Sequence, residues 1–338
     1  MNKGEFKDLL DNLETPKENN GERYLLIDGL NLFFRNFTMI NSVNSKGFHI
    51  GGLGGFFRSL GFLINNLQPT QVYVVFDGLG STIERKNIIP EYKSQRNQDR
   101  LTNWDVFDDL EEEDLSKVDQ ISKVISYLQN LPVKTVSIDR SEADDIIAHL
   151  SKVLPTNPED KIVIVSADHD FLQLINEQVV VWLARKKELY DKNSVLDHYG
   201  VLPQNFLIYK TLMGDQSDNI TGIKGLGKKS LLKRFPQLWD IPTSLDGIFK
   251  ICEENLKEHI SYARILEKSA TLEKSYRIMD LNNPMVSDSG KEYLKEVIKN
   301  PPPKFKPDNF IEMWQHDELG KMIRNVDTWV KDTFKPFI

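Results

Sequence analysis

Nine carboxylic acids follow short apolar runs along the chain, and together they suit metal-dependent chemistry at phosphorus. They are Asp28, Asp77, Glu142, Asp144, Asp145, Asp168, Asp170, Asp215 and Asp218. If these side chains converge, each like-charged pair at about 4 Å costs roughly 4 kcal/mol, so the cluster needs cations. Oxygen ligands without His or Cys favour Mg²⁺ or Mn²⁺ over zinc. Two such ions about 4 Å apart would activate a water molecule and clamp an in-line displacement at a phosphodiester.

Each acid also fits a local role that needs no metal. Asp28 and Asp77 precede glycines and fit turn positions. Ser141 and Asp144 have the spacing of a capping box, and Asp170 fits the N-cap of a helix. These local roles leave one coincidence unexplained, because all of them would fall at the same edge of one sheet.

A glycine-rich segment, residues 222–230, has the composition of a phosphate-binding turn. Its candidate contacts are Gly222, Lys224, Gly225, Gly227, Lys228 and Lys229. Glycines let backbone N–H groups approach a phosphate closely, and lysines add an attraction that ignores base sequence and weakens with salt. The alternative is a plain helix connector with solvated lysines.

Short apolar runs alternating with amphipathic segments predict the elements that must position these residues. The predicted strands are 24–28, 72–76, 133–138, 162–165 and 179–182, and the predicted helices include 51–67, 118–128 and 146–153. This alternation predicts a parallel α/β sheet, whose functional sites lie outside the carboxyl ends of the strands. From about residue 203 onward the pattern becomes helical.

The composition is that of an ordinary globular protein, with 338 residues, 40% hydrophobic and 28% charged. A single cysteine, Cys252, excludes an internal disulfide and a multi-cysteine zinc site. The net charge of −7 argues against a nucleic-acid partner only if charge is evenly spread. Residues 101–120 alone account for the whole acidic excess, whereas residues 222–234 carry basic side chains and no acid. No apolar run approaches a membrane span and residues 1–11 carry acids, so we expect a cytoplasmic protein without a membrane partner.

Six motifs in order resemble the flap endonuclease and 5′–3′ exonuclease family. They are I-D-G-x-N, V-F-D-G, E-Y-K-x-x-R, E-A-D-D, S-A-D-x-D and M-G-D-x-x-D-N-I-x-G-I-x-G-L-G-K, within residues 23–235. The resemblance is strongest to the stand-alone bacteriophage and bacterial branch, the phage ribonuclease H-like 5′ nucleases, and implies a phage-encoded protein in a bacterial host. It implies a parallel-sheet PIN-like core, a helical arch and a C-terminal helix–three-turn–helix.

Four units follow from this resemblance and from the composition. Residues 1–22 form an N-terminal extension, and 23–202 the nuclease core with its arch at about 84–122. Residues 203–290 form a helical DNA-binding region with the helix–three-turn–helix at about 214–235, and 291–338 a Pro-rich linker and C-terminal helical segment. The apolar end, 329–338, is predicted to pack onto the body. Docking of a sliding clamp or single-strand-binding protein is its alternative.

The resemblance also assigns roles to individual residues. The first metal site would use Asp28, Asp77, Glu142 and Asp144, the second Asp168, Asp170 and Asp215, with Asp145 between the sites and Asp218 in an outer shell. Lys93 and Arg96 would contact the scissile phosphate, and Tyr92 lies in the same motif as a DNA contact. Phe34 would stack on a terminal base, and Arg35 would touch phosphate.

The implied activity is a two-metal, Mg²⁺-dependent 5′ nuclease of DNA replication, monomeric, acting at 5′ flaps, nicks and recessed 5′ ends and on RNA paired to DNA. A monovalent ion such as K⁺ is implied in the glycine-rich turn. Within the arch we expect the basic limb to face the strand and the acidic limb, with Glu111, Glu112 and Glu113, to face solvent or limit non-specific binding. A catalytically silent branched-DNA-binding module is the alternative function.

Overall fold

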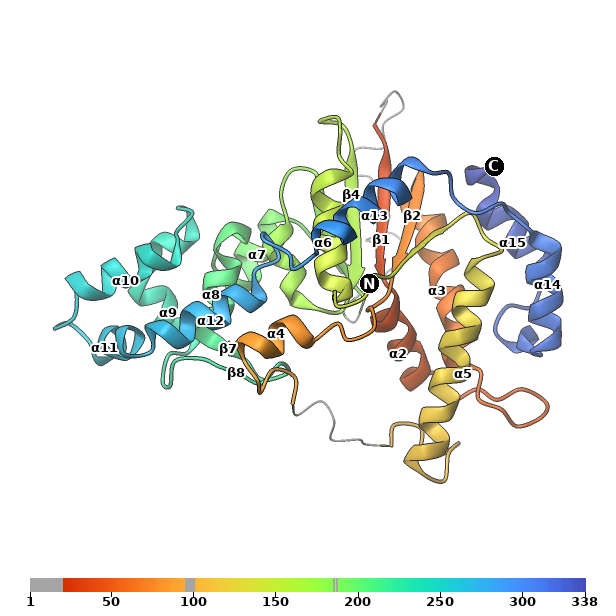
Figure 1. The fold of residues 1–338 in the computed structure, drawn as a ribbon, viewed down its shortest axis with the longest axis horizontal. Coiled ribbons are helices and arrows are strands. Elements are labelled where there is room, and N and C mark those ends of the chain that lie inside the picture. The colour runs from red at the N-terminus through yellow and green to blue at the C-terminus, as the bar shows by residue number, and fades with distance from the viewer. Residues whose placement is uncertain (1–20, 95–100, 185, 187) are drawn as a thin grey trace.

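A mixed sheet forms the centre of the computed structural model, which describes residues 21–94, 101–184, 186 and 188–338 (Figure 1). The strands are β1 (Arg23–Asp28), β2 (Gln71–Val75), β3 (Lys134–Val136), β4 (Lys161–Ser166), β5 (Val179–Leu183) and β6 (Glu188–Tyr190). Within the described residues their order is β3-β2-β1-β4-β5-β6. The first five run parallel, as predicted, and β6 is an antiparallel edge strand that the sequence analysis missed.

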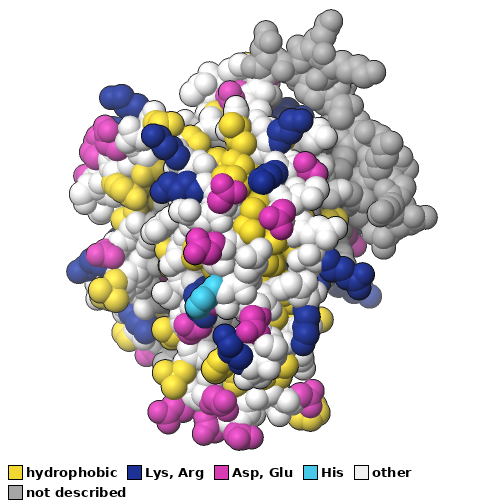
Figure 2. All heavy atoms as spheres, turned by 90° about the vertical axis from the view of Figure 1, so that its right-hand side faces the viewer, with side chains coloured by type: hydrophobic (Ala, Val, Ile, Leu, Met, Phe, Trp, Pro, Cys, Tyr) yellow, Lys and Arg dark blue, Asp and Glu magenta, His cyan; other side chains and the backbone are white. Residues whose placement is uncertain are grey.

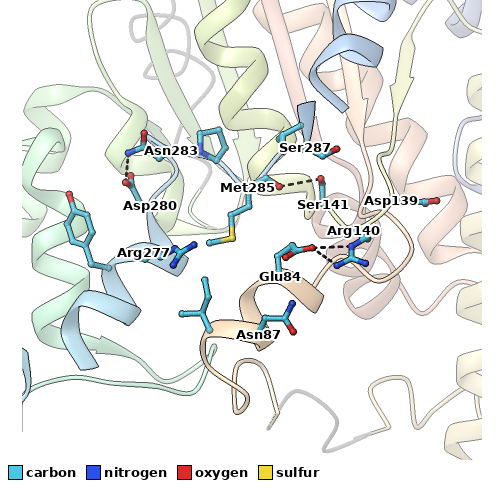
Figure 3. Close-up of a pocket in the computed structure, with 14 residues that line it drawn as sticks. Glu84, Asn87, Asp139, Arg140, Ser141, Arg277, Asp280, Asn283, Met285 and Ser287 are labelled. Atoms are coloured by element: carbon cyan, nitrogen blue, oxygen red, sulfur yellow. Dashed lines mark hydrogen bonds and ion pairs between the residues drawn. The ribbon is translucent and has the colours of Figure 1, made fainter. Parts of the chain in front are cut away.

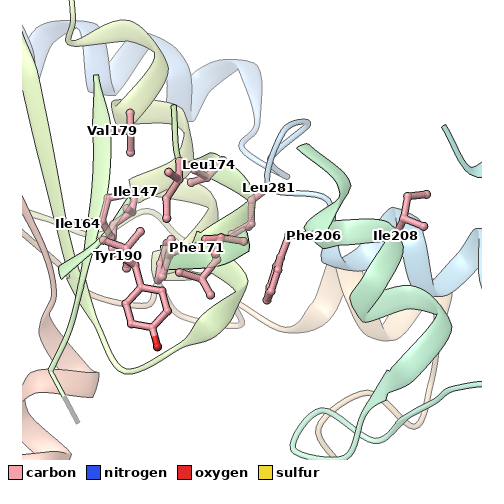
Figure 4. Close-up of a cluster of buried hydrophobic side chains, with 14 of the residues drawn as sticks. Ile147, Ile164, Phe171, Leu174, Val179, Tyr190, Phe206, Ile208 and Leu281 are labelled. Atoms are coloured by element: carbon pink, nitrogen blue, oxygen red, sulfur yellow. The ribbon is translucent and has the colours of Figure 1, made fainter. Parts of the chain in front are cut away.

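Both faces of the sheet are covered, which explains why its strands are continuous apolar runs. Leu25 and Ile27 face a cluster formed with α2 (Gly29–Met39), α3 (Gly51–Leu67) and α5 (Leu110–Leu128). Leu26 points to the other face, where α6 (Ala143–Val153) and the 3₁₀ turn η1 (His169–Leu174) pack (Figure 4). The same cluster continues from the sheet into the helical region, where Phe206 and Ile208 belong to it.

The segment predicted to form the arch contributes one helix before and one helix after the undescribed residues 95–100. Its first limb contains α4 (Ile83–Ile88), which contacts the later helix α12 (Ser269–Met279). Its second limb leads into α5, which packs on α3. Asp109 caps α5 by accepting the N–H of Glu112, so this helix begins eight residues before the predicted start.

The predicted helical region is confirmed after α7 (Lys192–Tyr199) and η2 (Pro203–Asn205). It contains α8 (Phe206–Met213), the short hairpin β7 (Gly214–Asp215) and β8 (Ile220–Thr221), α9 (Lys228–Arg234), η3 (Pro236–Trp239), α10 (Leu245–Glu254), α11 (Ile260–Glu267) and α12. The predicted domain boundary between residues 202 and 203 stays a prediction. Helix α13 (Asp288–Lys299) then returns to the sheet, where the Lys134 ammonium donates to the carbonyl of Ile298 at 2.9 Å.

The C-terminal segment packs onto the body, as predicted. It comprises α14 (Pro307–His316), η4 (Leu319–Lys321), α15 (Val326–Phe334) and η5 (Lys335–Phe337). Val330 and Phe334 are fully buried, and Trp314 stacks on Phe310 beside Phe57 of α3. On the face that these helices present, acidic and basic side chains both occur, with apolar side chains between them (Figure 2). None of the helices in the described residues is both long and apolar enough to cross a bilayer.

Candidate active site

Acids from distant parts of the chain meet in one pocket at the carboxyl edge of the sheet. Asp28 is the last residue of β1, Asp77 and Asp168 lie two residues beyond β2 and β4, and Asp144 lies in the first turn of α6. All four line a pocket of about 770 Å³ together with Lys93. The convergence that the sequence analysis required is therefore present for these five side chains.

Short hydrogen bonds orient the pocket acids. Asp28 accepts the backbone N–H of Asn31 and the hydroxyl of Ser166, both at 3.0 Å. Asp77 accepts the N–H of Ala143 at 2.7 Å, and Asp168 accepts the N–H of Asp170 at 2.9 Å. Because β1, β4, α2, α6 and η1 each contribute a residue to these bonds, the geometry of the pocket is set by the fold itself.

Two of the local roles are corrected by this geometry. Helix α6 has Glu142, not Ser141, at its N-cap position, and the Glu142 side chain accepts no N–H of the helix, so there is no capping box. Asp168 rather than Asp170 caps η1. Asp28 does act as an N-cap, of α2, while also lining the pocket, so capping and site formation coexist there.

The pocket is electrostatically unfavourable without a cation. Burial raises the pKa of Asp28 to about 7, and the charges of Asp77 and Asp168 add to this rise. Burial and the neighbouring Asp168 also raise the pKa of Asp144 well above its ordinary value. A cluster of hard oxygen donors whose acids resist ionisation fits a site for divalent cations.

A second acidic cluster adjoins the first. One carboxylate oxygen each from Asp170, Asp215 and Asp218 lie within 4.8 Å of one another. Burial raises the pKa of Asp170 to about 7, with Asp168 contributing. This donor set, which again lacks His and Cys, also fits a divalent cation.

Lys210 holds this second cluster together and was missed by the sequence analysis. Its ammonium lies 2.6 Å from Asp170 Oδ1 and also contacts Asp215. Burial alone would raise the pKa of Asp215, but Lys210 lowers it to about 2. The overlooked signal was a lone lysine inside the apolar helix α8, because a buried lysine needs an acidic partner.

Lys93 and Tyr92 meet at Glu142. The Lys93 ammonium lies 2.9 Å from both carboxylate oxygens of Glu142, whose side chain is buried. Tyr92 is 3% exposed and donates its hydroxyl to Glu142 Oε2 at 3.1 Å. The predicted DNA contact of Tyr92 is therefore corrected, since this side chain supports Glu142 from the interior.

Asp145 forms a buried ion pair with Arg85. Its two oxygens face the guanidinium of Arg85 at 2.5 and 3.1 Å, and Oδ1 also accepts the N–H of Met285 at 2.8 Å. It does not line the pocket that holds Asp144. Asp145 is thus paired with Arg85, and its predicted place between the two metal sites stays a prediction.

Apart from Tyr92, the predicted DNA contacts that the structure describes are accessible to solvent. Phe34 is 42% exposed, and Phe34 and Arg35 line the pocket next to Asp28. Lys224, Lys228 and Lys229 are exposed in and after the glycine-rich turn. Arg96 lies outside the described residues.

The three glycines of the turn have different structural roles. Gly225 has a φ of +82°, which favours glycine. A Cβ at Gly222 would lie 2.2 Å from the carbonyl oxygen of Met213, so this residue allows close approach of β8 to the end of α8. Gly227 precedes α9 and has open space around it.

The acidic limb of the arch is only partly solvent-facing. Glu111 and Glu112 are exposed, as expected. Glu113 is fully buried and accepts the backbone N–H groups of Thr102 and Asn103 at 2.8 and 3.0 Å. The expectation was wrong for Glu113, whose carboxylate organises the turn before α5.

A parallel sheet with an acidic pocket at its carboxyl edge, an arch and a following helical region defines a nuclease of the PIN-like class. The chain belongs to the 5′–3′ exonuclease family: the model of the N-terminal resolvase-like domain matches residues 23–200, and that of the C-terminal SAM fold matches residues 201–288.

Curated relatives agree with this family. The chain is 31% identical to a 5′–3′ exonuclease of Aquifex aeolicus over 306 residues, which is 89% of this chain and 94% of the relative. It is 29% identical to DNA polymerase I of Bacillus subtilis over 80% of this chain but only 29% of the polymerase.

Solved structures share the fold. The T5 D15 protein co-crystallised with metal ions matches with a TM-score of 0.63 at 18% identity, covering 94% of this chain and all of that one. A complex of the bacteriophage T5 D15 flap endonuclease with DNA and metal ions matches with a TM-score of 0.60 at 18% identity, covering 93% of this chain and 99% of that one.

Proposed function

We propose that this protein is a Mg²⁺-dependent 5′–3′ exonuclease and flap endonuclease that hydrolyses phosphodiester bonds near 5′ ends. The observation that carries the proposal is the pocket in which Asp28, Asp77, Asp144 and Asp168 converge beside Lys93. Its substrates would be DNA with 5′ flaps, nicks or recessed 5′ ends and RNA paired to DNA, as arise in replication. The T5 flap endonuclease of the same fold was solved with DNA and metal ions, which supports this choice.

The acids divide into two neighbouring groups that would hold two divalent ions. Asp28, Asp77 and Asp144 would hold one, with Glu142 behind Lys93 as a further predicted ligand of that ion. Asp168, Asp170 and Asp215 would hold the other, with Asp218 beside them. When bound, the two ions supply an activated water molecule and stabilise charge on the leaving oxygen. The backbone bonds to Asp28, Asp77 and Asp168 keep these carboxylates in place before substrate arrives.

Lys93 would stabilise negative charge on the scissile phosphate. It lines the pocket, and Glu142 holds its ammonium in position from behind. A preorganised cation in a partly buried site stabilises developing charge more strongly than one in water. Arg96 stays a prediction in the same role.

Surface residues would bind the substrate on either side of this chemistry. Phe34 would stack on a terminal base and Arg35 would contact a phosphate at the rim of the pocket. The lysines of the glycine-rich turn would grip duplex phosphates, with a K⁺ ion in the turn. Residues 329–338 would stabilise the fold in this proposal, because Val330 and Phe334 are buried in the body.

Cleavage of a labelled 5′-flap DNA with Mg²⁺ or with EDTA tests the proposal. The wild-type protein should cut only with Mg²⁺, and Asp77→Asn and Asp168→Asn should bind the flap without cutting it. Wild-type binding without cutting would favour the silent branched-DNA-binding module. Product maps on matched flap, nicked and RNA–DNA substrates would then rank the substrates.

A further inference from the structure

Arg85 in α4 is a buried arginine that joins three separate parts of the chain. It is 3% exposed. Its Nη1 and Nη2 lie 2.5 and 3.1 Å from Asp145, and Nη1 lies 3.2 Å from Glu142. Its Nε donates to the carbonyl of Ile278 at 2.8 Å, near the end of α12. Every nitrogen of the guanidinium therefore has a partner, as a buried arginine requires.

Arg85 contacts Glu142 and Asp145, which lie on either side of Asp144 in the sequence. Glu142 immediately precedes α6 and Asp145 lies in its first turn, so Arg85 anchors this end of the helix. Asp144 lines the pocket, whereas Glu142 and Asp145 do not. Fixing the two flanking carboxylates on the interior side leaves Asp144 directed at the pocket.

Arg85 also acts on the arch. It lies in the helix that leads to Tyr92 and Lys93, and all three side chains converge on Glu142. Through Ile278 the same guanidinium holds the helical region against the core. One side chain therefore links the first limb of the arch, the pocket acids and the helical region.

We propose that Arg85 is a positioning residue that sets the direction of Asp144 and the place of Lys93, and so the assembly of the divalent-ion site. The inference rests on the proposed nuclease function. Its competitor is a purely structural role, in which Arg85 stabilises the fold and any cation of similar size serves. The two roles differ for Arg85→Lys, because lysine keeps the charge but loses the bidentate fork.

The test compares Arg85→Lys and Arg85→Gln with a matched control, Arg140→Gln. Arg140 pairs with Glu84 of the same helix α4 at 2.6 Å, but this pair is exposed at the mouth of a different pocket of about 680 Å³ (Figure 3). Two quantities are measured: Mn²⁺ binding to the protein without DNA by calorimetry, and the single-turnover rate of flap cleavage at saturating Mg²⁺. Thermal unfolding is recorded for every variant.

We expect Arg85→Lys to lose roughly 10–100-fold in Mn²⁺ affinity or cleavage rate, as is typical when a group that orients metal ligands is changed. Arg140→Gln should leave both unchanged. An Arg85→Lys variant with wild-type affinity and rate would overturn the proposal.

If Arg85→Gln is destabilised, Asp145→Asn is added to it, because this second change removes the buried Asp145 charge that has lost its partner. The double variant should regain thermal stability while its cleavage defect persists. Recovery of the rate together with the stability would show a purely structural role. If wild type and Arg140→Gln both fail to cut, the proposed function fails, while the Mn²⁺ comparison still tests the positioning role.

Discussion

The Lys93 ammonium lies 2.9 Å from both carboxylate oxygens of the buried Glu142. Lys93 has a φ of +54°, an uncommon backbone conformation for a residue with a side chain. The position of Lys93 at the pocket is thus fixed both by its backbone conformation and by its charge-assisted contact with Glu142.

Replacing Lys93 should impair chemistry more than binding. We expect Lys93→Ala to lower the single-turnover cleavage rate by roughly 100-fold or more, because one preorganised electrostatic group is typically worth that much. Flap affinity measured with Ca²⁺ should change little, and Lys331→Ala, at an exposed lysine of α15, serves as control. Equal losses of affinity and rate would contradict the assigned role.

Glu113 should make the stability of the turn before α5 depend on pH. Burial alone would raise its pKa, but hydrogen bonds from Lys117, Thr102 and Asn103 outweigh burial and lower the pKa to about 2 from the ordinary 4.5. The stability that this carboxylate contributes is therefore complete above pH 4.5 and is lost as the pH falls toward 2.

Substitution tests this contribution directly. Glu113→Ala leaves the buried N–H of Asn103 and the part-buried N–H of Thr102 without their acceptor, and the buried group alone costs about 1–3 kcal/mol in the free energy of unfolding. The exposed Glu111→Ala should be near neutral. Urea unfolding of both variants at pH 7 and pH 3 is the measurement, and a Glu113 variant whose deficit stays the same at pH 3 would show that another group is responsible.

Replacement by alanine should destabilise the turn at Gly222 but not at Gly227. A Cβ at Gly222 meets the Met213 carbonyl at 2.2 Å, so Gly222→Ala should destabilise the turn by about 1–3 kcal/mol and weaken duplex binding. A Cβ at Gly227 meets no protein atom within 4 Å, so Gly227→Ala should leave the thermal stability unchanged. Thermal unfolding and binding to a nicked duplex decide the matter, and similar behaviour of the two variants would contradict the geometry.

The sequence analysis correctly predicted the features that depend on local hydrophobic pattern and on the position of acids at strand ends. The five parallel strands are confirmed because fully buried strands appear as apolar runs, and Asp28, Asp77, Asp144 and Asp168 meet as expected because parallel strands share one edge. The roles of Asp145 and Tyr92 could not be predicted. They depend on partners that lie far away along the chain, Arg85 for Asp145 and Glu142 for Tyr92.

Lys210 and β6 were missed for different reasons. A lysine in an apolar helix gives no local indication of its partner, and Asp170 lies on a different element. Strand β6 has three residues, too few for any periodic pattern, and depends on pairing with β5. Tertiary contact decides both, and local sequence does not encode it.

Removing the C-terminal ten residues should destabilise the protein. The deletion of 329–338 exposes the surface that Val330 and Phe334 cover and removes Trp329 from its contact with Gly61. Full burial of one such side chain contributes about 1.5–3 kcal/mol, so the unfolding temperature should fall by several degrees. Deleting only the exposed Ile338 is the control. Unchanged stability with a lost response to a replication protein would instead indicate docking.

The central claim is that carboxylates from separate strand ends hold divalent ions, and Mn²⁺ binding without DNA tests it most directly. Calorimetry on wild type, Asp28→Asn and Asp144→Asn is compared with Asp139→Asn, an exposed acid outside the pocket. The account predicts Mn²⁺ binding that falls by roughly 10–100-fold in each pocket variant and is unchanged in Asp139→Asn. Mn²⁺ affinity that is the same in all four proteins would contradict it.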